Sequence, residues 1–193
     1  MGFREPGTAK TWLKNIEDEI MNAVDMTLVD GVYVSKHSVI AGEVSIGKGS
    51  NIWPYASIRG DVAAIKVGER VSVQDQVMLH CRHKIDLEIG NDVVIGHQAC
   101  VHCKYVGEGA LIGISSTILD HAVVGAGAIV AAGAVVKPGT EIPPGTMWAG
   151  VPAKQIRVLK DSEIEYIKDV SSRYLELAQN HVDGKFPKGF KPI

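Results

Sequence analysis

Branched aliphatic residues recur every six positions through the middle of the chain, with breaks in the count after Ile58, Leu79 and Val101 and with Trp148 as the last position. The series contains nineteen positions: Val34, Ile40, Ile46, Ile52, Ile58, Val67, Val73, Leu79, Ile89, Ile95, Val101, Val106, Ile112, Ile118, Val124, Val130, Val136, Ile142 and Trp148. A period of six matches neither an amphipathic helix nor a simple meander of alternating strands. It predicts short strands joined by tight turns, each with one inward-facing anchor residue, stacked as a parallel β-solenoid.

The two ends of the chain show helical spacing instead. Apolar residues between positions 8 and 24 fall on one side of a predicted helix, with acidic residues largely on the other. Ser162 and Glu165 have the spacing of a capping box and precede a second apolar stripe that runs to about Asn180. We therefore predict an N-terminal helix and lead-in (residues 1–30), a β-helix domain of about six triangular coils (31–153) and a C-terminal helix and tail (154–193).

Composition supports a mainly β fold and excludes several classes of function. The chain has 43 Ile and Val residues against 9 Leu, and β-branched side chains favour strands. A net charge of −2 gives no electrostatic reason to expect nucleic-acid binding. The longest uncharged stretch, His121 to Val136, is shorter than the roughly 20 residues of a transmembrane helix. We therefore expect neither a nucleic-acid partner nor a transmembrane segment.

Two histidines occupy equivalent positions in the repeat. His80 follows the anchor Leu79 and His102 follows the anchor Val101, three hexads later if residues 81–88 form a loop. The two side chains then lie on one face of adjacent coils, about 4.8 Å apart, which suits two imidazoles that share a metal ion. His97 lies near a different corner and does not easily reach the same ion within one chain, whereas a three-fold oligomer could bring it from a neighbouring chain.

The sequence resembles the γ-class carbonic anhydrases over roughly residues 32–180. The resemblance rests on the hexapeptide-repeat run VIAGEVSIGKGSNIWPYASIRGDV and on the segments SVQDQVMLH, IGHQACVH and MWAGVPAKQIR. Hexapeptide-repeat proteins of this kind fold as left-handed parallel β-helices, so the resemblance implies that handedness here. Because acyltransferases share the repeat, it indicates the fold more strongly than the function.

The resemblance also implies a metal centre between subunits. His80 and His102 from one chain and His97 from the next would bind zinc, or iron or cobalt, in a homotrimer or in a heterotrimer with related subunits. A metal-bound hydroxide would then convert CO2 to bicarbonate. Gln74 and Asp75 match a polar pair beside the metal-bound water.

Four further residues belong to this expected site or its surroundings. Arg59 and Asp61 match an intersubunit ion pair of the family, which locks the interface. Tyr174 on the C-terminal helix either points at the site or only packs. His83 is a candidate proton shuttle, because an unperturbed imidazole titrates near pH 6.5.

The sequence departs from the archetypal active enzyme at several places. Val62 stands where a glutamate follows the RGD aspartate, and the short segment 81–84 replaces an acidic loop that carries a shuttle glutamate. Ser72 and Cys103 replace an asparagine and a glycine. The spacing of Cys100 and Cys103 permits a redox or thiolate-metal role, whereas we expect both to serve packing.

Three functional hypotheses follow. The first is a carbonic anhydrase, and the second is a weakly active or inactive γ-carbonic-anhydrase-like subunit of mitochondrial respiratory complex I, attached to its membrane arm. The N-terminal helix favours that context and a location on the matrix side of the inner membrane; otherwise the protein is cytoplasmic. The third is a hexapeptide acyltransferase that uses one histidine as a base. His37, His121 and His181 are expected to be surface residues.

Overall fold

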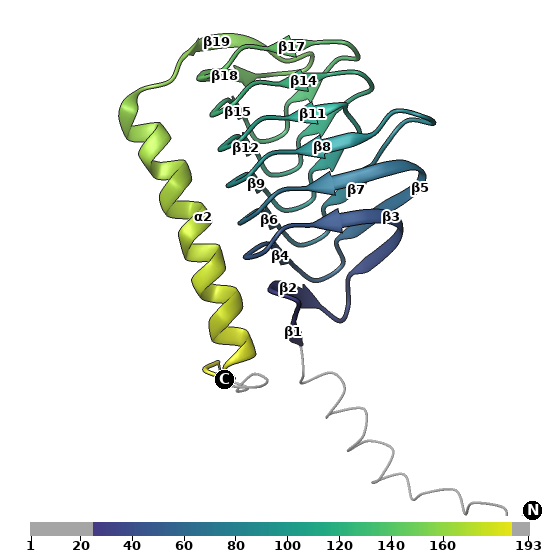
Figure 1. Cartoon of the computed structure of the whole chain (residues 1–193). Helices are drawn as coiled ribbons and strands as arrows, with labels where there is room; N and C mark the ends of the chain where they lie inside the picture. The colour runs from purple at the N-terminus through teal and green to yellow at the C-terminus, as the bar shows by residue number, and fades with distance from the viewer. Residues whose placement is uncertain (1–24, 187–193) are drawn as a thin grey trace, which may run out of the picture.

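The chain forms a parallel β-solenoid of about six turns with one long helix along its side (Figure 1). The computed structural model describes residues 25–186. The helix predicted within residues 8–24 and the end of the tail lie outside the described residues. A mainly β architecture with a parallel solenoid and a C-terminal helix was predicted, and both are confirmed.

The strands form three faces. The first contains β2 (Val32–Ser35), β4 (Asn51–Ile52), β6 (Ser72–Val73), β9 (Val94–Ile95), β12 (Leu111–Ile112), β15 (Ile129–Val130) and β18 (Thr146–Ala149). The second contains β7 (Met78–His80), β10 (Cys100–Val101), β13 (Thr117–Ile118) and β16 (Val135–Val136). The third contains β8 (Leu87–Ile89), β11 (Tyr105–Val106), β14 (Val123–Val124) and β17 (Glu141–Ile142).

Two longer strands bend around a corner and join the second face to the third. These are β3 (Val39–Ile46) and β5 (Ser57–Val67). The first part of β5 pairs with β7 and its last part pairs with β8, so one strand contributes to both faces. At the two ends of the first face, β1 (Met26–Val29) and β19 (Lys154–Val158) pair antiparallel with β2 and β18.

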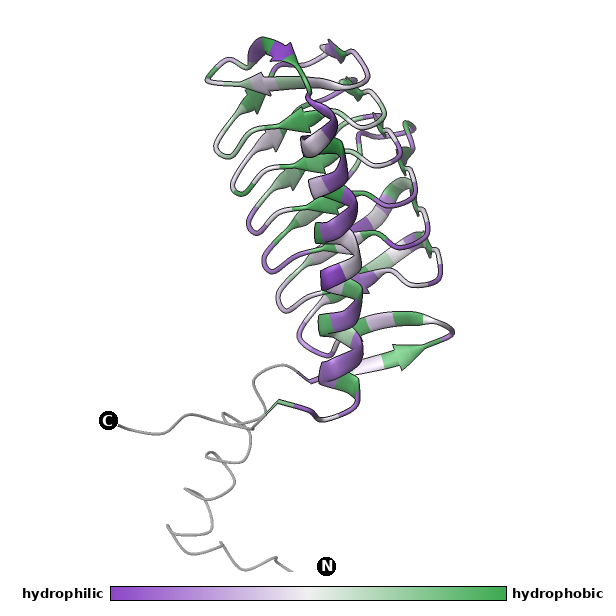
Figure 2. Ribbon diagram, turned by 90° about the vertical axis from the view of Figure 1, so that its left-hand side faces the viewer, coloured by the Kyte–Doolittle hydropathy of each residue, from purple (hydrophilic) through white to green (hydrophobic). Residues whose placement is uncertain are grey.

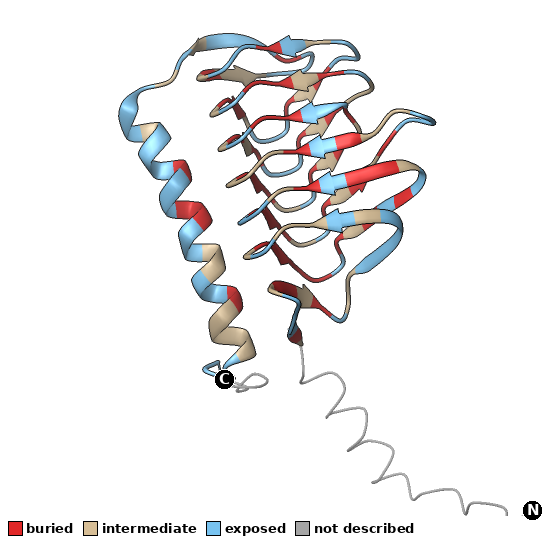
Figure 3. Ribbon diagram, in the orientation of Figure 1, coloured by how far each residue is buried: buried red, intermediate tan, exposed pale blue. Residues whose placement is uncertain are grey.

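Parallel pairing places the aliphatic anchors of successive coils directly above one another. On the second face Ile58, Leu79, Val101 and Ile118 form one such column. Fifteen of the nineteen anchors are buried in the core, as the red strand positions in Figure 3 illustrate. The other four, which are only partly buried or exposed, belong to the first and last coils: Val34, Ile40, Ile46 and Trp148.

Glycine often follows an anchor because the corners of successive coils approach closely. A Cβ atom on Gly107 would lie 2.5 Å from the backbone nitrogen of Ala126 in the next coil. Such a contact is far inside van der Waals range, so the corner accepts no side chain at this position. The close stacking keeps the strands short and their register fixed.

The helix α2 (Asp161–Val182) covers the lower coils of the first face. It contacts β1, β4, β6 and β9, and Figure 2 shows it lying across the stacked hydrophobic strands. Ile167, Val170 and Ala178 are the hydrophobic residues that it buries. This apolar stripe fixes the helix against the solenoid, which holds Tyr174 over the same face.

The start of α2 corrects the sequence prediction. Glu163, and not Glu165, accepts a hydrogen bond from the backbone N–H of Lys160, at 2.9 Å. Ser162 lies inside the first turn and does not cap the helix. Both carboxylate oxygens of Glu163 also accept from Arg157 at 2.6 Å, so an ion pair with β19 selects the glutamate that caps.

No helix within residues 25–186 has the length and apolar character needed to cross a membrane.

We predict that anchors at equivalent positions contribute different amounts to the stability of the protein, depending on the coil in which they lie. Ile118→Ala removes a fully buried side chain and should cost about 3 kcal/mol of unfolding free energy. Ile40→Ala is the matched control, because the same residue type on the same face is 40% exposed in the first coil. It should cost less than half as much. Urea denaturation at one protein concentration measures both, and equal losses would contradict the columnar core.

Candidate metal centre

Two histidine rings lie side by side on the second face of the solenoid. His80 ends β7, and His102 directly follows β10. Leu79 pairs with Val101, so the next residue of each strand projects in the same direction one coil apart. The ring centroids are 5.2 Å apart, and Nδ1 of His80 lies 3.1 Å from Nε2 of His102. The register of the repeat therefore places the pair as the six-residue spacing indicated.

A carboxylate holds the outer nitrogen of His80. Asp61 Oδ1 lies 2.9 Å from His80 Nε2, and Arg59 donates to Asp61 Oδ2 at 2.7 Å. The hydrogen bond from His80 chiefly lowers the pKa of Asp61, and the charge of Arg59 adds to the effect. Arg59 and Asp61 thus form an ion pair within one chain, and Asp61 also orients a candidate ligand.

A second carboxylate holds the outer nitrogen of His102. Asp120 Oδ1 lies 2.5 Å from His102 Nδ1, and Arg82 donates to Asp120 Oδ2 at 2.8 Å. Hydrogen bonds from Arg82 and His102 lower the pKa of Asp120. Sequence reasoning missed both Asp120 and Arg82. The signal was available, because Ile118 continues the anchor column above Val101 and places the following residues near His102.

These hydrogen bonds determine which ring nitrogens carry protons. An ionised carboxylate can only accept, so in neutral rings these partners assign the proton of His80 to Nε2 and that of His102 to Nδ1. His80 Nδ1 and His102 Nε2 then face each other with free lone pairs at 3.1 Å. Two lone pairs cannot hydrogen-bond to each other, whereas a shared cation stabilises them. Two nitrogen ligands of a tetrahedral zinc ion lie about 3.3 Å apart, so the donor set fits the metal that the sequence suggests.

His97 belongs to a separate cluster at another corner of the solenoid. Its Nδ1 lies 2.9 Å from Asp75 Oδ2, and its backbone N–H donates to the buried Gln74 Oε1 at 3.1 Å. The proton therefore resides on Nδ1, and the Nε2 lone pair accepts from the Tyr174 hydroxyl at 3.2 Å. This is the same tautomer as that of His102, with Nε2 available to a ligand.

The two clusters do not form one site within a single chain. Among residues 25–186, no group of three or more His, Cys, Asp and Glu side chains could hold a metal ion. One chain supplies a facing pair, His80 and His102, and a third imidazole on a different corner. Gln74, Asp75 and Tyr174 lie with this third imidazole and not with the pair.

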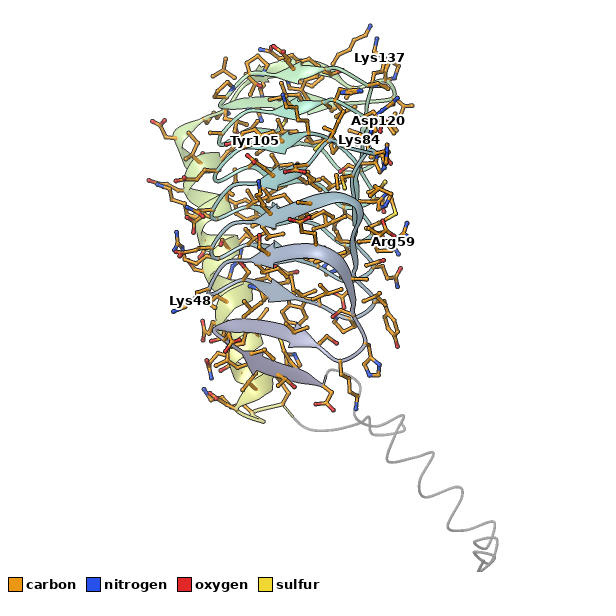
Figure 4. The ribbon with its side chains drawn as sticks, turned by 45° about the vertical axis from the view of Figure 1, so that its right-hand side comes forward. Lys48, Arg59, Lys84, Tyr105, Asp120 and Lys137 are labelled. Atoms are coloured by element: carbon orange, nitrogen blue, oxygen red, sulfur yellow. The ribbon has the colours of Figure 1, made fainter. Side chains whose placement is uncertain are left out.

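Figure 4 shows Arg59 and Asp120 projecting from the same side of the solenoid. Asp120 contacts His102, and Asp61, the partner of Arg59, contacts His80. His83 is exposed in the loop between β7 and β8. Val62 is 38% exposed and leaves an apolar position next to Asp61.

A cavity of about 600 Å³ separates part of α2 from the first face. His97, Gln74 and Tyr174 contribute polar groups to its wall, and most of the rest is apolar, including Leu111 and Met147. The burial of Tyr174 beside this cavity raises the pKa of its hydroxyl, and the charge of Asp75 adds to the effect. Tyr174 is therefore a neutral donor toward His97.

The cysteines do not form a thiolate site. Cys81, Cys100 and Cys103 are all free, and Cys81 and Cys103 are buried. Burial raises the pKa of the Cys103 thiol to about 12 and also raises that of Cys100. A protonated, buried thiol neither binds metal nor exchanges disulfides readily, so packing accounts for Cys103.

Comparison with known proteins identifies several relatives. A family model described as bacterial transferase hexapeptide (six repeats) matches residues 104–138. The carbonic anhydrase of Geobacillus kaustophilus is 44% identical over 147 residues, covering 76% of this chain and 81% of that protein. Gamma carbonic anhydrase 2, mitochondrial, of Arabidopsis thaliana is 41% identical over 90% of this chain, which spans 65% of that relative's length.

Among solved structures, a hexapeptide transferase family protein from Anaplasma phagocytophilum is similar to this chain with a TM-score of 0.69. The two are 35% identical, and the match covers 78% of this chain and 94% of that one. The solenoid is therefore shared with proteins that carry a transferase description as well as with proteins named as carbonic anhydrases.

We predict that Cys103 resists alkylation in the folded protein. At a pH near 8 its thiolate fraction is small because the thiol pKa is about 12, and reactivity should rise as the pH increases toward that value. Mass spectrometry after iodoacetamide treatment measures modification at each cysteine, with unfolded protein as the control. Rapid alkylation of native Cys103, or a disulfide between Cys100 and Cys103, would contradict the packing role.

Proposed function

This chain belongs to the γ-class carbonic anhydrase family, and from that premise we propose that it interconverts CO2 and bicarbonate at a metal centre shared between subunits. The observation that carries the proposal is the pair of ring nitrogens, His80 Nδ1 and His102 Nε2, that face each other at 3.1 Å. A pair held in this way by two carboxylates supports metal binding more than a role in packing.

We propose that a neighbouring chain supplies the third ligand. His97 has the tautomer with an unprotonated Nε2, which accepts from the Tyr174 hydroxyl in the single chain and would exchange that bond for the metal. Asp75 fixes its ring as Asp61 and Asp120 fix the other two. A closed trimer brings the His97 corner of one chain against the histidine pair of the next at three equivalent interfaces. A homotrimer and a heterotrimer with related subunits both satisfy this requirement.

When bound, a zinc, iron or cobalt ion supplies Lewis acidity that brings the pKa of a water molecule toward 7. The chain's own residues would then position the reactants. The carbonyl oxygen of Gln74 already accepts from the His97 backbone, so its amide N–H groups remain to donate to an oxygen of CO2 or bicarbonate. Asp75 acts on His97 and so positions a ligand.

Proton export is assigned to His83 in this proposal. The side chain is exposed in the loop that follows His80, where solvent buffer can reach it. Val62 offers no carboxylate for this role, and an imidazole can both accept and donate a proton.

The second candidate is a structural subunit with little activity, as in the complex I hypothesis. The mitochondrial name of a relative that matches 90% of this chain favours it, together with Val62 at the position of a catalytic glutamate. A complex I subunit would lie on the matrix side of the inner mitochondrial membrane. A free enzyme could also be located in the cytoplasm. An acyltransferase is disfavoured, because a histidine base does not need a second imidazole facing it.

Subunit mixing tests the shared centre. His80→Ala and His97→Ala chains should each bind little metal alone, whereas an equal random mixture should regain about a quarter of the sites, because each intact site needs one chain of each kind in the correct order. Metal content per chain provides the measurement. A mixture of His80→Ala and His102→Ala is the matched control and should regain none. Equal recovery in both mixtures would contradict the assignment.

Stopped-flow CO2 hydration distinguishes the enzyme from the structural subunit. Metal-loaded protein should hydrate CO2 well above the buffer rate, and His102→Ala should abolish the increase. His83→Gln should slow turnover in dilute buffer and recover in imidazole buffer, since added buffer replaces a proton shuttle. The exposed His121→Asn variant is the control. A wild-type rate equal to that of buffer would favour the structural subunit.

A further inference from the structure

We propose that Asp120 is a positioning residue that selects the metal-binding tautomer of His102, and that Arg82 orients Asp120 for this purpose. The inference rests on the proposed metal centre and adds to it a residue pair that the sequence did not indicate. Asp120 follows β13 and lies one coil beyond His102. Asp120 contacts His102, the proposed metal ligand, and would not contact the substrate.

The geometry assigns a separate task to each oxygen of the carboxylate. Oδ1 accepts from His102 Nδ1 at 2.5 Å, and Oδ2 accepts from Arg82 at 2.8 Å. A guanidinium group can only donate, so the atom that faces Arg82 must be an acceptor. Asp120 and His102 are each only about a quarter exposed, which limits competition from water.

The same arrangement occurs on the other histidine of the pair. Asp61 accepts from His80 with one oxygen and from Arg59 with the other. Two Arg–Asp–His units therefore meet where the free nitrogens face each other. Because both histidines of the pair have the same arrangement, we infer that each aspartate serves to fix the position of the ring proton on its histidine, in addition to pairing with its arginine.

Substitution by asparagine gives a sharp test because Arg82 determines how the amide is oriented. The amide oxygen of Asp120→Asn must face Arg82, so its NH2 group faces His102 Nδ1 and donates to it. The ring proton of His102 then moves to Nε2, which lies 3.1 Å from His80 Nδ1. A direct hydrogen bond between the histidines would occupy the position of the metal.

We therefore expect Asp120→Asn to weaken Co²⁺ binding more than Asp120→Ala. Loss of a carboxylate behind a ligand histidine typically costs 10–100-fold in metal affinity, so we expect about 10-fold for the alanine variant and about 100-fold for the asparagine variant. Visible absorption of Co²⁺ in competition with a chelator measures both. Adding Arg82→Met to Asp120→Asn lets the amide flip so that its oxygen faces His102 Nδ1. The double variant should therefore regain part of the Co²⁺ affinity.

Asp92→Asn is the matched control. Asp92 pairs with Arg70 through both carboxylate oxygens, at 2.7 and 2.8 Å, so the variant breaks an Arg–Asp pair of the same solenoid. It should leave Co²⁺ affinity unchanged. A role for Asp120 in charge or folding alone predicts the opposite order, with the isosteric asparagine milder than alanine.

The tautomer can also be read without metal. Long-range proton–nitrogen correlation spectra of the metal-free protein should show His102 protonated on Nδ1 in the wild type and on Nε2 in Asp120→Asn. An unchanged tautomer, or equal Co²⁺ affinity in both Asp120 variants, would overturn the inference while leaving the metal centre intact. Failure of the wild type to bind Co²⁺, with the tautomer change observed, would instead refute the metal centre and keep the role of Asp120 in proton placement.

Discussion

The parallel hydrogen-bonded register between coils is the constraint on which the rest of the structure depends. Each strand contributes few residues, and its neighbours above and below fix which of them faces inward. A shift by one residue would send every anchor to the surface and turn the histidines into the core. The stiff β-branched anchors and the close approach of the glycine corners both resist that shift. The packing of the core therefore fixes where the histidine side chains lie.

The aspartates that contact the histidines decide which ring nitrogen of each histidine is left to bind a cation. An imidazole can place its proton on either nitrogen, and the two choices present opposite surfaces to a cation. Each of the three candidate ligands hydrogen-bonds to an aspartate. Two of these aspartates, Asp61 and Asp120, also accept a hydrogen bond from an arginine. In neutral rings this arrangement leaves His80 Nδ1 and His102 Nε2 unprotonated and facing each other, while the unprotonated Nε2 of His97 faces the Tyr174 hydroxyl.

Period and phase predicted most of the fold and the facing pair of His80 and His102, because both follow from counting along one repeat. Asp120 was missed because its contact depends on how a side chain turns at a corner, which counting does not specify. The cap of α2 was assigned to the wrong residues for a related reason. Glu163 is selected by Arg157 from β19, a tertiary contact that a local capping pattern does not contain. The predicted N-terminal helix lies outside the described residues.

A parallel solenoid has two open ends whose backbone groups could accept another coil, and stacks of such ends would grow into fibrils. In this molecule β1 and β19 run antiparallel to their neighbours and close both ends of the first face. Each hairpin turns the chain back at the end of this face, so the edge that it presents runs opposite to the parallel strands of the coils. On this face the parallel stacking of the repeat therefore ends within the chain's own fold.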